Sequence, residues 1–318
     1  MSRVGIVLGA GGAVGHAFHA GVLAALSDEI GWDARRAEIV VGTSAGSLTG
    51  AMLRAGFAPT DLAARALDEP LSADGQDLVR RSGLRAPAAP ARPPRPAARP
   101  SSPTRLARAF WQPWRIRPGT LAAALLPAGQ IPLDPLQEPF AALFDAGWPD
   151  ARLWINAVDL DRGERVVFGR DGAPPATVGQ AVAASCAIPA YYAPVEIGTV
   201  RYVDGGVHSP TNADVLADAD LELVIVSSPM STTRQAARRG MDAPMRHALR
   251  LTLGAEVARL RARGITVVTF APDRADQAVM AGNPLDPTKR APVCRQVRAT
   301  TVRRLRRADL RRHLGAIA

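Results

Sequence analysis

Short apolar runs alternate with helical patterns over the first 55 residues of the chain. Val4 to Leu8 is a continuous apolar run that predicts a buried strand, and a glycine-rich loop, Gly9 to Gly15, and a helical pattern, His16 to Ile30, follow it. Glu38 to Val41 predicts a second strand, and Leu48 to Ala55 predicts a second helix. This order predicts an α/β fold with a mostly parallel central sheet flanked by helices.

Strand and helix patterns resume after residue 150. Leu153 to Val158 and Arg165 to Phe168 flank a turn rich in Asp and Gly and predict a hairpin, while Thr177 to Cys186 predicts a short helix. The remaining expected elements are a strand that ends at Asp204, strands Leu221 to Ser227 and Ile265 to Phe270, and an amphipathic helix Met245 to Arg263. We expect residues 1–318 to form a single domain.

The pattern is weaker between residues 57 and 150, which predicts a helical cap or insert. Residues 86–103 are almost entirely Ala, Pro, Arg and Ser and cannot bury enough apolar surface to offset their ordering entropy, so we expect them to be disordered. Aromatic residues alternate with arginines in the stretch 105–117 that follows. Two interpretations stay open for this stretch: an interfacial element that inserts aromatic side chains into a bilayer, or a helix that packs over the functional site.

Composition and charge limit the class of protein. The chain is 47% hydrophobic, which is ample for a buried core, and its net charge of +10 rests on arginine because Lys289 is the only lysine. An excess of arginine reflects either a GC-rich coding sequence or a role in binding an anionic partner. The segment 292–318 has the pattern of a basic C-terminal helix, which leaves peripheral contact with an anionic membrane open. We do not expect a nucleic-acid partner, because no zinc finger or aromatic platform accompanies the charge.

The two cysteines, Cys186 and Cys294, are too few for a disulfide framework and lack metal-ligand spacing. We therefore expect free thiols, no metal and no cofactor. The apolar start of the chain is too short and too rich in glycine for a signal peptide, and no uncharged apolar run reaches the ~18 residues of a membrane span. The expected location is the cytoplasm, either free or peripheral to the membrane.

The most informative local motif is Gly-x-Ser-x-Gly at residues 42–46. It lies between the second predicted strand and the second predicted helix, as in a nucleophile elbow, where a sharp turn raises the serine out of the sheet. Glycines flank the serine in such a turn because side chains there would clash with neighbouring elements. Ser44 is thus the first candidate for a nucleophile.

The glycine loop at residues 9–15 has two interpretations. As a dinucleotide-binding turn it would need an acidic residue at the end of the second strand, but that strand ends in Val41 and Gly42, and Glu38 lies at its start. The favoured interpretation is an oxyanion hole, in which backbone N–H groups near Gly11 and Gly12 face the charge that develops on an attacked carbonyl.

A serine nucleophile needs a base, and two candidates occur close together. Asp204 ends a predicted strand and is followed by two glycines, which allow another part of the backbone to approach closely. His208 follows this turn and is the best candidate among the histidines for the base of a serine triad. Residue spacing alone does not decide between them.

Several separated blocks together resemble the patatin-like phospholipase family. They are the glycine loop running on to His19–Leu23, the elbow at 42–46, the turn Asp159–Glu164, the segment Ala184–Pro189, and Asp204-Gly205-Gly206. The resemblance implies a serine acyl hydrolase with a Ser-Asp dyad in place of a triad. It identifies Ser44 as the nucleophile, Asp204 as its partner, and the backbone around Gly11 and Gly12 as the oxyanion hole, with no histidine required.

The resemblance also implies a lipid ester substrate, cleaved as by a phospholipase A or esterase. The chain departs from the family pattern at two positions, with Val14 where the loop often has a basic residue and Ala10 where it usually begins with glycine. The alternative function is a catalytically weak protein on the same scaffold that binds membranes or nucleotides.

Overall fold

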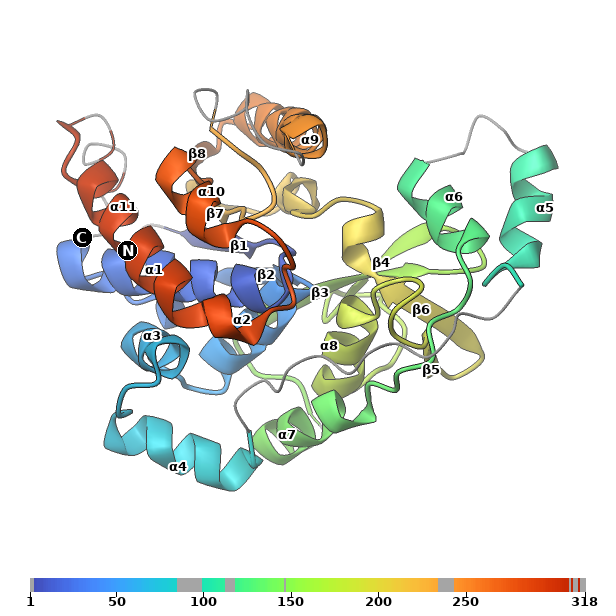
Figure 1. The fold of residues 1–318 in the computed structure, drawn as a ribbon, viewed down its shortest axis with the longest axis horizontal. Helices are drawn as coiled ribbons and strands as arrows, with labels where there is room; N and C mark the ends of the chain where they lie inside the picture. Colours follow the sequence, from blue (N-terminus) through green and yellow to red (C-terminus); the bar gives the residue numbers. More distant parts are fainter. Residues whose placement is uncertain are drawn as a thin grey trace.

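The computed structural model describes residues 3–84, 99–111, 118–145, 147–233, 243–308, 310 and 314 of the chain, and its fold is drawn in Figure 1. Most of the segment expected to be disordered, 86–103, lies outside the described residues, as do residues 112–117 of the stretch that alternates aromatic residues with arginines.

The sheet has eight strands, and the order of its main path is β5-β6-β3-β2-β1-β7-β8, with β4 also paired to β3. Strands β3, β2, β1, β7 and β8 run parallel, whereas β4 and β6 are antiparallel to β3 and β5 is antiparallel to β6. The strand bounds are β1 (Val4–Leu8), β2 (Ile39–Thr43), β3 (Arg152–Asp159), β4 (Glu164–Phe168), β5 (Val195–Ile197), β6 (Val200–Asp204), β7 (Leu223–Ser227) and β8 (Thr266–Phe270).

Helices cover both faces of this sheet, which confirms the predicted fold class. In Figure 1, α9 lies at the top of the view and α3 and α4 at the bottom, with the strands between them. The helix bounds are α1 (Gly12–Ile30), α2 (Ala45–Arg54), α3 (Pro59–Leu67), α4 (Ala73–Ser82), α5 (Pro103–Trp111), α6 (Pro118–Leu125), α7 (Asp134–Phe144), α8 (Val178–Cys186), α9 (Ala243–Ala262), α10 (Arg274–Met280) and α11 (Arg290–Leu305).

The central strands are apolar along their whole length because both of their faces are covered. In β1, Ile6 and Leu8 point into the core that contains α1, whereas Val7 points into the core that contains α9. The same alternation recurs in β7, where Ile225 faces the first core and Val226 the second. A strand buried on one face only would carry a polar residue at every second position.

The first helix begins four residues before the predicted start at His16, since α1 starts at Gly12. The glycine loop therefore supplies the first helical turn, so its backbone N–H groups lie at a helix N-terminus. The hairpin predicted around residues 159–163 is confirmed by the antiparallel pairing of β3 with β4.

Strands β2 and β6 approach each other end to end along one edge of β3. Thr43 at the end of β2 pairs with Asn156, and Asp204 at the end of β6 pairs with the next residue of β3, Ala157. Both pairs lie on the same edge, because β4 pairs with Asn156 and Ala157 on the opposite edge. This arrangement brings the residue after β2, Ser44, next to the last residue of β6.

The region 57–150 does not form one separate body in the described residues. Helix α3 packs against α1 and places Leu62 and Ala66 in the main core. Helix α7 packs against α8, while α5 and α6 lie at the opposite end of the molecule from α1 and α11 (Figure 1). Among the described residues of this region, only those at the start of α7 line the cavity described below.

The basic helix at the C-terminus, α11, packs against α1 and buries Val293 and Val297. Several of its arginines make contacts within the molecule. Arg298 pairs with Asp28 of α1 at 2.6 Å, and Arg304 donates to the Thr269 carbonyl and lies over a core phenylalanine ring. Part of the positive charge of this segment therefore serves internal packing. Among the described helices, none is both long enough and apolar enough to cross a bilayer.

The contact between β1 and the start of α2 leaves no room for a side chain at residue 46. A Cβ atom on Gly46 would lie 1.8 Å from the Leu8 carbonyl oxygen. We predict that Gly46→Ala prevents stable folding or lowers the thermal midpoint by about 5 °C or more, because backbone atoms must move and the free energy of unfolding falls by about 3 kcal/mol or more. Thermal unfolding followed by circular dichroism measures the change in the midpoint.

The matched control is Gly254→Ala in α9, where an added Cβ meets no atom within 4 Å. This variant should be neutral or gain up to ~1 kcal/mol, because alanine is the better helix former. Equal melting temperatures of the two variants would contradict the packing described for the elbow.

Candidate active site

Ser44 lies at the sharp turn between β2 and α2, as the elbow motif predicts. Its backbone has φ 54° and ψ −119°, a conformation that a residue with a side chain rarely adopts and that costs about 1–3 kcal/mol. Ser185 of α8 links the turn to β3. The Ser44 N–H donates to Ser185 Oγ at 2.8 Å, and Ser185 Oγ donates to the Asn156 carbonyl at 2.6 Å. The strained backbone is thereby fixed to the adjacent strand β3.

The glycines of the elbow motif allow this turn to pack. A Cβ atom on Gly42 would lie 2.5 Å from the Cα of Ser47, so only glycine fits beneath the first turn of α2. The Ser47 hydroxyl donates to the Ser44 carbonyl at 2.6 Å, and the backbone N–H groups of Ser47 and Leu48 donate to the same carbonyl at 2.8 and 3.3 Å.

Asp204 is buried beside Ser44, with 5% of its surface exposed. One of its carboxylate oxygens accepts a hydrogen bond from the Gly206 N–H at 2.7 Å. Burial raises the pKa of Asp204 to about 6, against the opposing effects of this hydrogen bond and of the neighbouring Ser44 side chain. The carboxylate is thus a stronger base than an ordinary aspartate.

The glycine loop lies on the other side of Ser44. Gly12 and Ala13 line the same cavity as Ser44, whereas Gly11 packs against Gly15 and Pro229. Within the described part of the chain, the N–H groups of Gly11, Gly12 and Ala13 have no hydrogen-bond partner, while the Val14 N–H donates to the Pro284 carbonyl at 3.0 Å. Unpaired amides therefore line the cavity at the N-terminus of α1, where the helix dipole favours negative charge.

The cavity beside Ser44 has a volume of about 170 Å³ and a mainly apolar lining. Leu48 of α2, Leu133 and Leu136 at the start of α7, Ile188 and Leu285 contribute this surface. An apolar cavity that ends at a serine and at unpaired amides is suited to an acyl chain whose carbonyl lies at the polar end.

One comparison with known proteins identifies the family of the chain. The model of the family described as "Patatin-like phospholipase" matches residues 6–217, a stretch that contains the glycine loop, the elbow and Asp204. The chain belongs to the patatin-like phospholipase family.

Comparison with solved structures finds VipD from Legionella pneumophila, which is 12% identical with a TM-score of 0.46. The match covers 95% of this chain and 66% of the VipD chain. No curated protein matches the sequence.

One histidine of this patatin-like chain, His16, lines the cavity, but its chemistry makes it a poor base. Thr49 Oγ1 donates to the Ala45 carbonyl at 2.9 Å, so it accepts from His16 Nδ1, which lies 2.8 Å away and must carry the proton. Burial, with the nearby positive charges of Arg65 and Arg290, lowers the pKa of His16 to about 3. The imidazole is therefore neutral at any ordinary pH.

The remaining histidines lie elsewhere. His19 Nε2 donates to the Gly9 carbonyl at 2.8 Å and its Nδ1 accepts from Ser227, so this ring ties the glycine loop to β7. His208, the candidate for a triad base, lines a different cavity together with Glu256 and is absent from the lining of the Ser44 cavity. His313 lies outside the described residues.

Sequence reasoning missed the residues that support the site from behind. Ser185 carried a local signal, since it lies in one of the family-like blocks, but its role as an acceptor for the Ser44 N–H depends on the packing of α8 against β3. Cys186 lines the cavity, and burial raises the pKa of its thiol to about 12, which leaves it unreactive.

The raised pKa of Asp204 has a consequence for stability. The folded state binds the proton more tightly than the unfolded state does, so the folded protein loses stability as the pH rises from about 4 through 6. We predict that Asp204→Asn raises the free energy of unfolding by about 2 kcal/mol at pH 8, with no difference below pH ~4. Urea denaturation of both proteins at a series of pH values measures this difference in the free energy of unfolding.

Asp161→Asn is the control of opposite sign. Burial would raise the pKa of Asp161, but hydrogen bonds from Arg201 and Ser102 outweigh burial and lower it. Its replacement should therefore destabilise the protein at pH 8, with the loss disappearing at low pH. If Asp204→Asn also destabilised the protein at pH 8, the carboxylate would not carry the burial penalty described here.

Proposed function

We propose that the protein hydrolyses carboxylic esters of lipids through an acyl-enzyme on Ser44, with Asp204 as the general base. The observation that carries this proposal is the position of a buried carboxylate of raised pKa beside Ser44, which itself lines the apolar cavity. A base must lie within hydrogen-bond reach of the proton that it removes, and its pKa should approach the working pH.

The first half of the reaction forms the acyl-enzyme. The Ser44 oxygen attacks the ester carbonyl carbon while Asp204 takes the hydroxyl proton, and the carbonyl oxygen becomes an oxyanion. We assign the oxyanion hole to the backbone around Gly11 and Gly12, extended by the Ala13 N–H. The tetrahedral intermediate then collapses, the ester C–O bond breaks, and protonated Asp204 returns the proton to the leaving alcohol.

The second half releases the acid. Asp204 removes a proton from water, the hydroxide attacks the acyl carbon, and the same amides stabilise the second oxyanion. The Ser44–acyl bond breaks, and Ser44 regains its proton from Asp204. No histidine is needed, which is consistent with the low pKa of His16 and with the separate location of His208.

The strongest alternative is a binding protein on the same scaffold with weak catalytic activity. The unpaired N–H groups at the start of α1 could also donate hydrogen bonds to the phosphate of a nucleotide, but the cavity beside them is mainly apolar. Its lining favours an acyl group.

Removal of the nucleophile tests the proposal directly. We predict that Ser44→Ala lowers kcat/KM for a short-chain nitrophenyl ester at least about a thousandfold and keeps the wild-type melting temperature within a few degrees. Ser82→Ala at the end of α4, far from the cavity, is the matched control and should keep full activity. Wild-type turnover in Ser44→Ala would remove the assignment.

The pH dependence of the rate tests the base. Because Asp204 must be ionised to accept the proton, kcat/KM should rise with pH and reach half of its plateau at about pH 6. An ordinary aspartate would give a midpoint near pH 4. A rate that stays constant from pH 8 down to pH 4.5 would show that the base does not have the raised pKa proposed here.

A further inference from the structure

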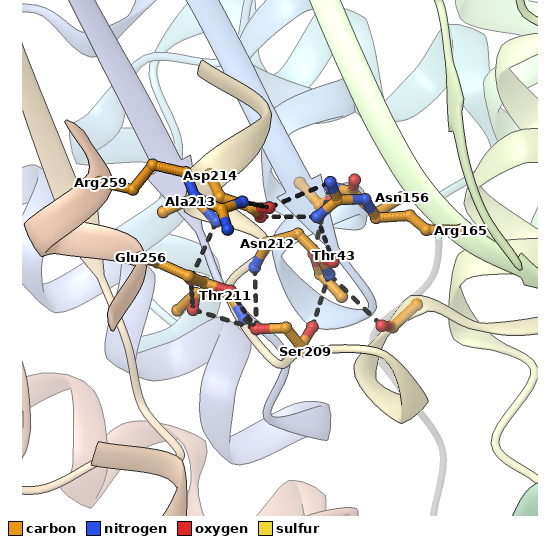
Figure 2. Close-up of polar contacts among 12 residues, drawn as sticks. Thr43, Asn156, Arg165, Ser209, Thr211, Asn212, Ala213, Asp214, Glu256 and Arg259 are labelled. Carbon is orange, nitrogen blue, oxygen red and sulfur yellow. Dashed lines mark hydrogen bonds and ion pairs between the residues drawn. The ribbon is translucent and has the colours of Figure 1, made fainter. Parts of the chain in front are cut away.

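A buried polar cluster lies behind the elbow, on the side away from the cavity, and Figure 2 shows its contacts. Asn212 is at its centre and has no exposed surface. Its backbone has φ 50°, in the left-handed region that asparagine tolerates better than most residues with a side chain. This residue follows the Asp204 turn by eight positions in the sequence.

The side-chain amide of Asn212 connects the two strands that end at the candidate dyad. Its Nδ2 donates to Thr43 Oγ1 at 3.2 Å and to the Gly205 carbonyl at 3.3 Å, as well as to the Ser209 carbonyl (Figure 2). Thr43 directly precedes Ser44, and Gly205 directly follows Asp204. One amide group therefore contacts the neighbour of each member of the dyad.

An ion-pair network fixes the orientation of this amide. Arg165 donates to Asn212 Oδ1 at 3.2 Å, so the amide nitrogen must point to the other side, toward Thr43 and Gly205. Arg165 is held in turn by Asp214 at 2.6 Å, and Arg259 of α9 contacts the same carboxylate at 3.1 Å. A flipped amide would place its donors against the arginine.

Helix α9 anchors the loop that carries Asn212. The buried carboxylate of Glu256 accepts hydrogen bonds from Ser209 Oγ and Thr211 Oγ1, both at 2.6 Å, and from the Ala213 N–H at 3.0 Å (Figure 2). Glu256 lies beyond the residues 6–217 that match the family model. The C-terminal part of the chain thus holds the loop on both sides of Asn212.

From this geometry we infer that Asn212 is a positioning residue that sets the separation of Ser44 and Asp204. The inference rests on the proposed dyad. The ends of β2 and β6 meet along β3 without a direct backbone bond between them, and the Asn212 amide supplies a polar link across this junction. Displacement of a catalytic group by about 1 Å can reduce the rate about a hundredfold.

The principal test is Asn212→Gly, which keeps the positive φ accessible and removes only the amide. We expect kcat for a nitrophenyl ester to fall about 30- to 100-fold, with KM within about threefold of wild type, because the cavity lining is unchanged. The rate of Ser44 modification by a fluorophosphonate should fall by a similar factor. Unchanged values of kcat and labelling rate would overturn the inference.

Thr211→Val is the matched control for general destabilisation. It removes one hydrogen bond to Glu256 from the same loop but touches neither Thr43 nor Gly205. We expect a lower melting temperature with kcat near wild type. If Thr211→Val lowered kcat as much as Asn212→Gly does, the loss would reflect a loosened loop, and the specific role of the amide would be refuted.

A second variant covers the case in which Asn212→Gly does not fold. Asn212→Asp keeps the size, the tolerance for positive φ and the contact with Arg165, but it replaces the amide donors by an acceptor. We expect a lower kcat and a pH midpoint shifted upward, because a second negative charge near Asp204 disfavours its ionisation. Wild-type kcat and pH midpoint would contradict the inference.

A structural readout separates this inference from the proposed function. In crystals of the Asn212 variants, we expect the distance between Ser44 Oγ and the Asp204 carboxylate to be about 1 Å greater than in the wild-type protein, whether or not the wild-type protein hydrolyses esters. An unchanged distance would overturn the positioning role. An inactive wild-type enzyme whose variants show this increased distance would instead overturn only the proposed function.

Discussion

The candidate site depends on the meeting of two strand ends along a third strand. Thr43 and Asp204 pair with consecutive residues of β3, so the turn that follows β2 must lie beside the last residue of β6. This pairing places Ser44 beside Asp204 although the two residues lie 160 positions apart in the sequence. The carboxylate is buried by the same pairing, and its burial raises its pKa.

Burial of the carboxylate and strain at the serine both oppose stability. Ser44 adopts a positive φ, and Asp204 is ionised at neutral pH although little of its surface is exposed. Rigid surroundings hold both residues in place. These are a sheet covered by helices on both faces, the hydrogen bond that the Ser44 N–H donates to Ser185 Oγ, and the hydrogen bond that Asn212 Nδ2 donates to Thr43. Local instability at an otherwise well-packed position is typical of functional sites.

Much of this could be predicted from the sequence because the signals are local. The strand runs, the glycine loop and the elbow each lie within a few consecutive residues, and the Asp-Gly-Gly turn marked Asp204. The start of α1 at Gly12 was missed because glycine is a poor helix former and hides the first turn. Asn212 and Glu256 gave no local signal, since a polar residue in a loop and a glutamate on an amphipathic helix are common. Their roles depend on contacts with residues 43 to 169 positions away in the sequence.

The central claim is that Asp204 activates Ser44, and the reaction with a fluorophosphonate measures this activation without a lipid substrate. Labelling of the wild-type protein and of Asp204→Asn, followed by peptide mass spectrometry, gives both the site and the rate. The account predicts one label per chain on Ser44 and a rate at least about a hundredfold lower in Asp204→Asn. A label on another residue, or an equal rate in the two proteins, would contradict it.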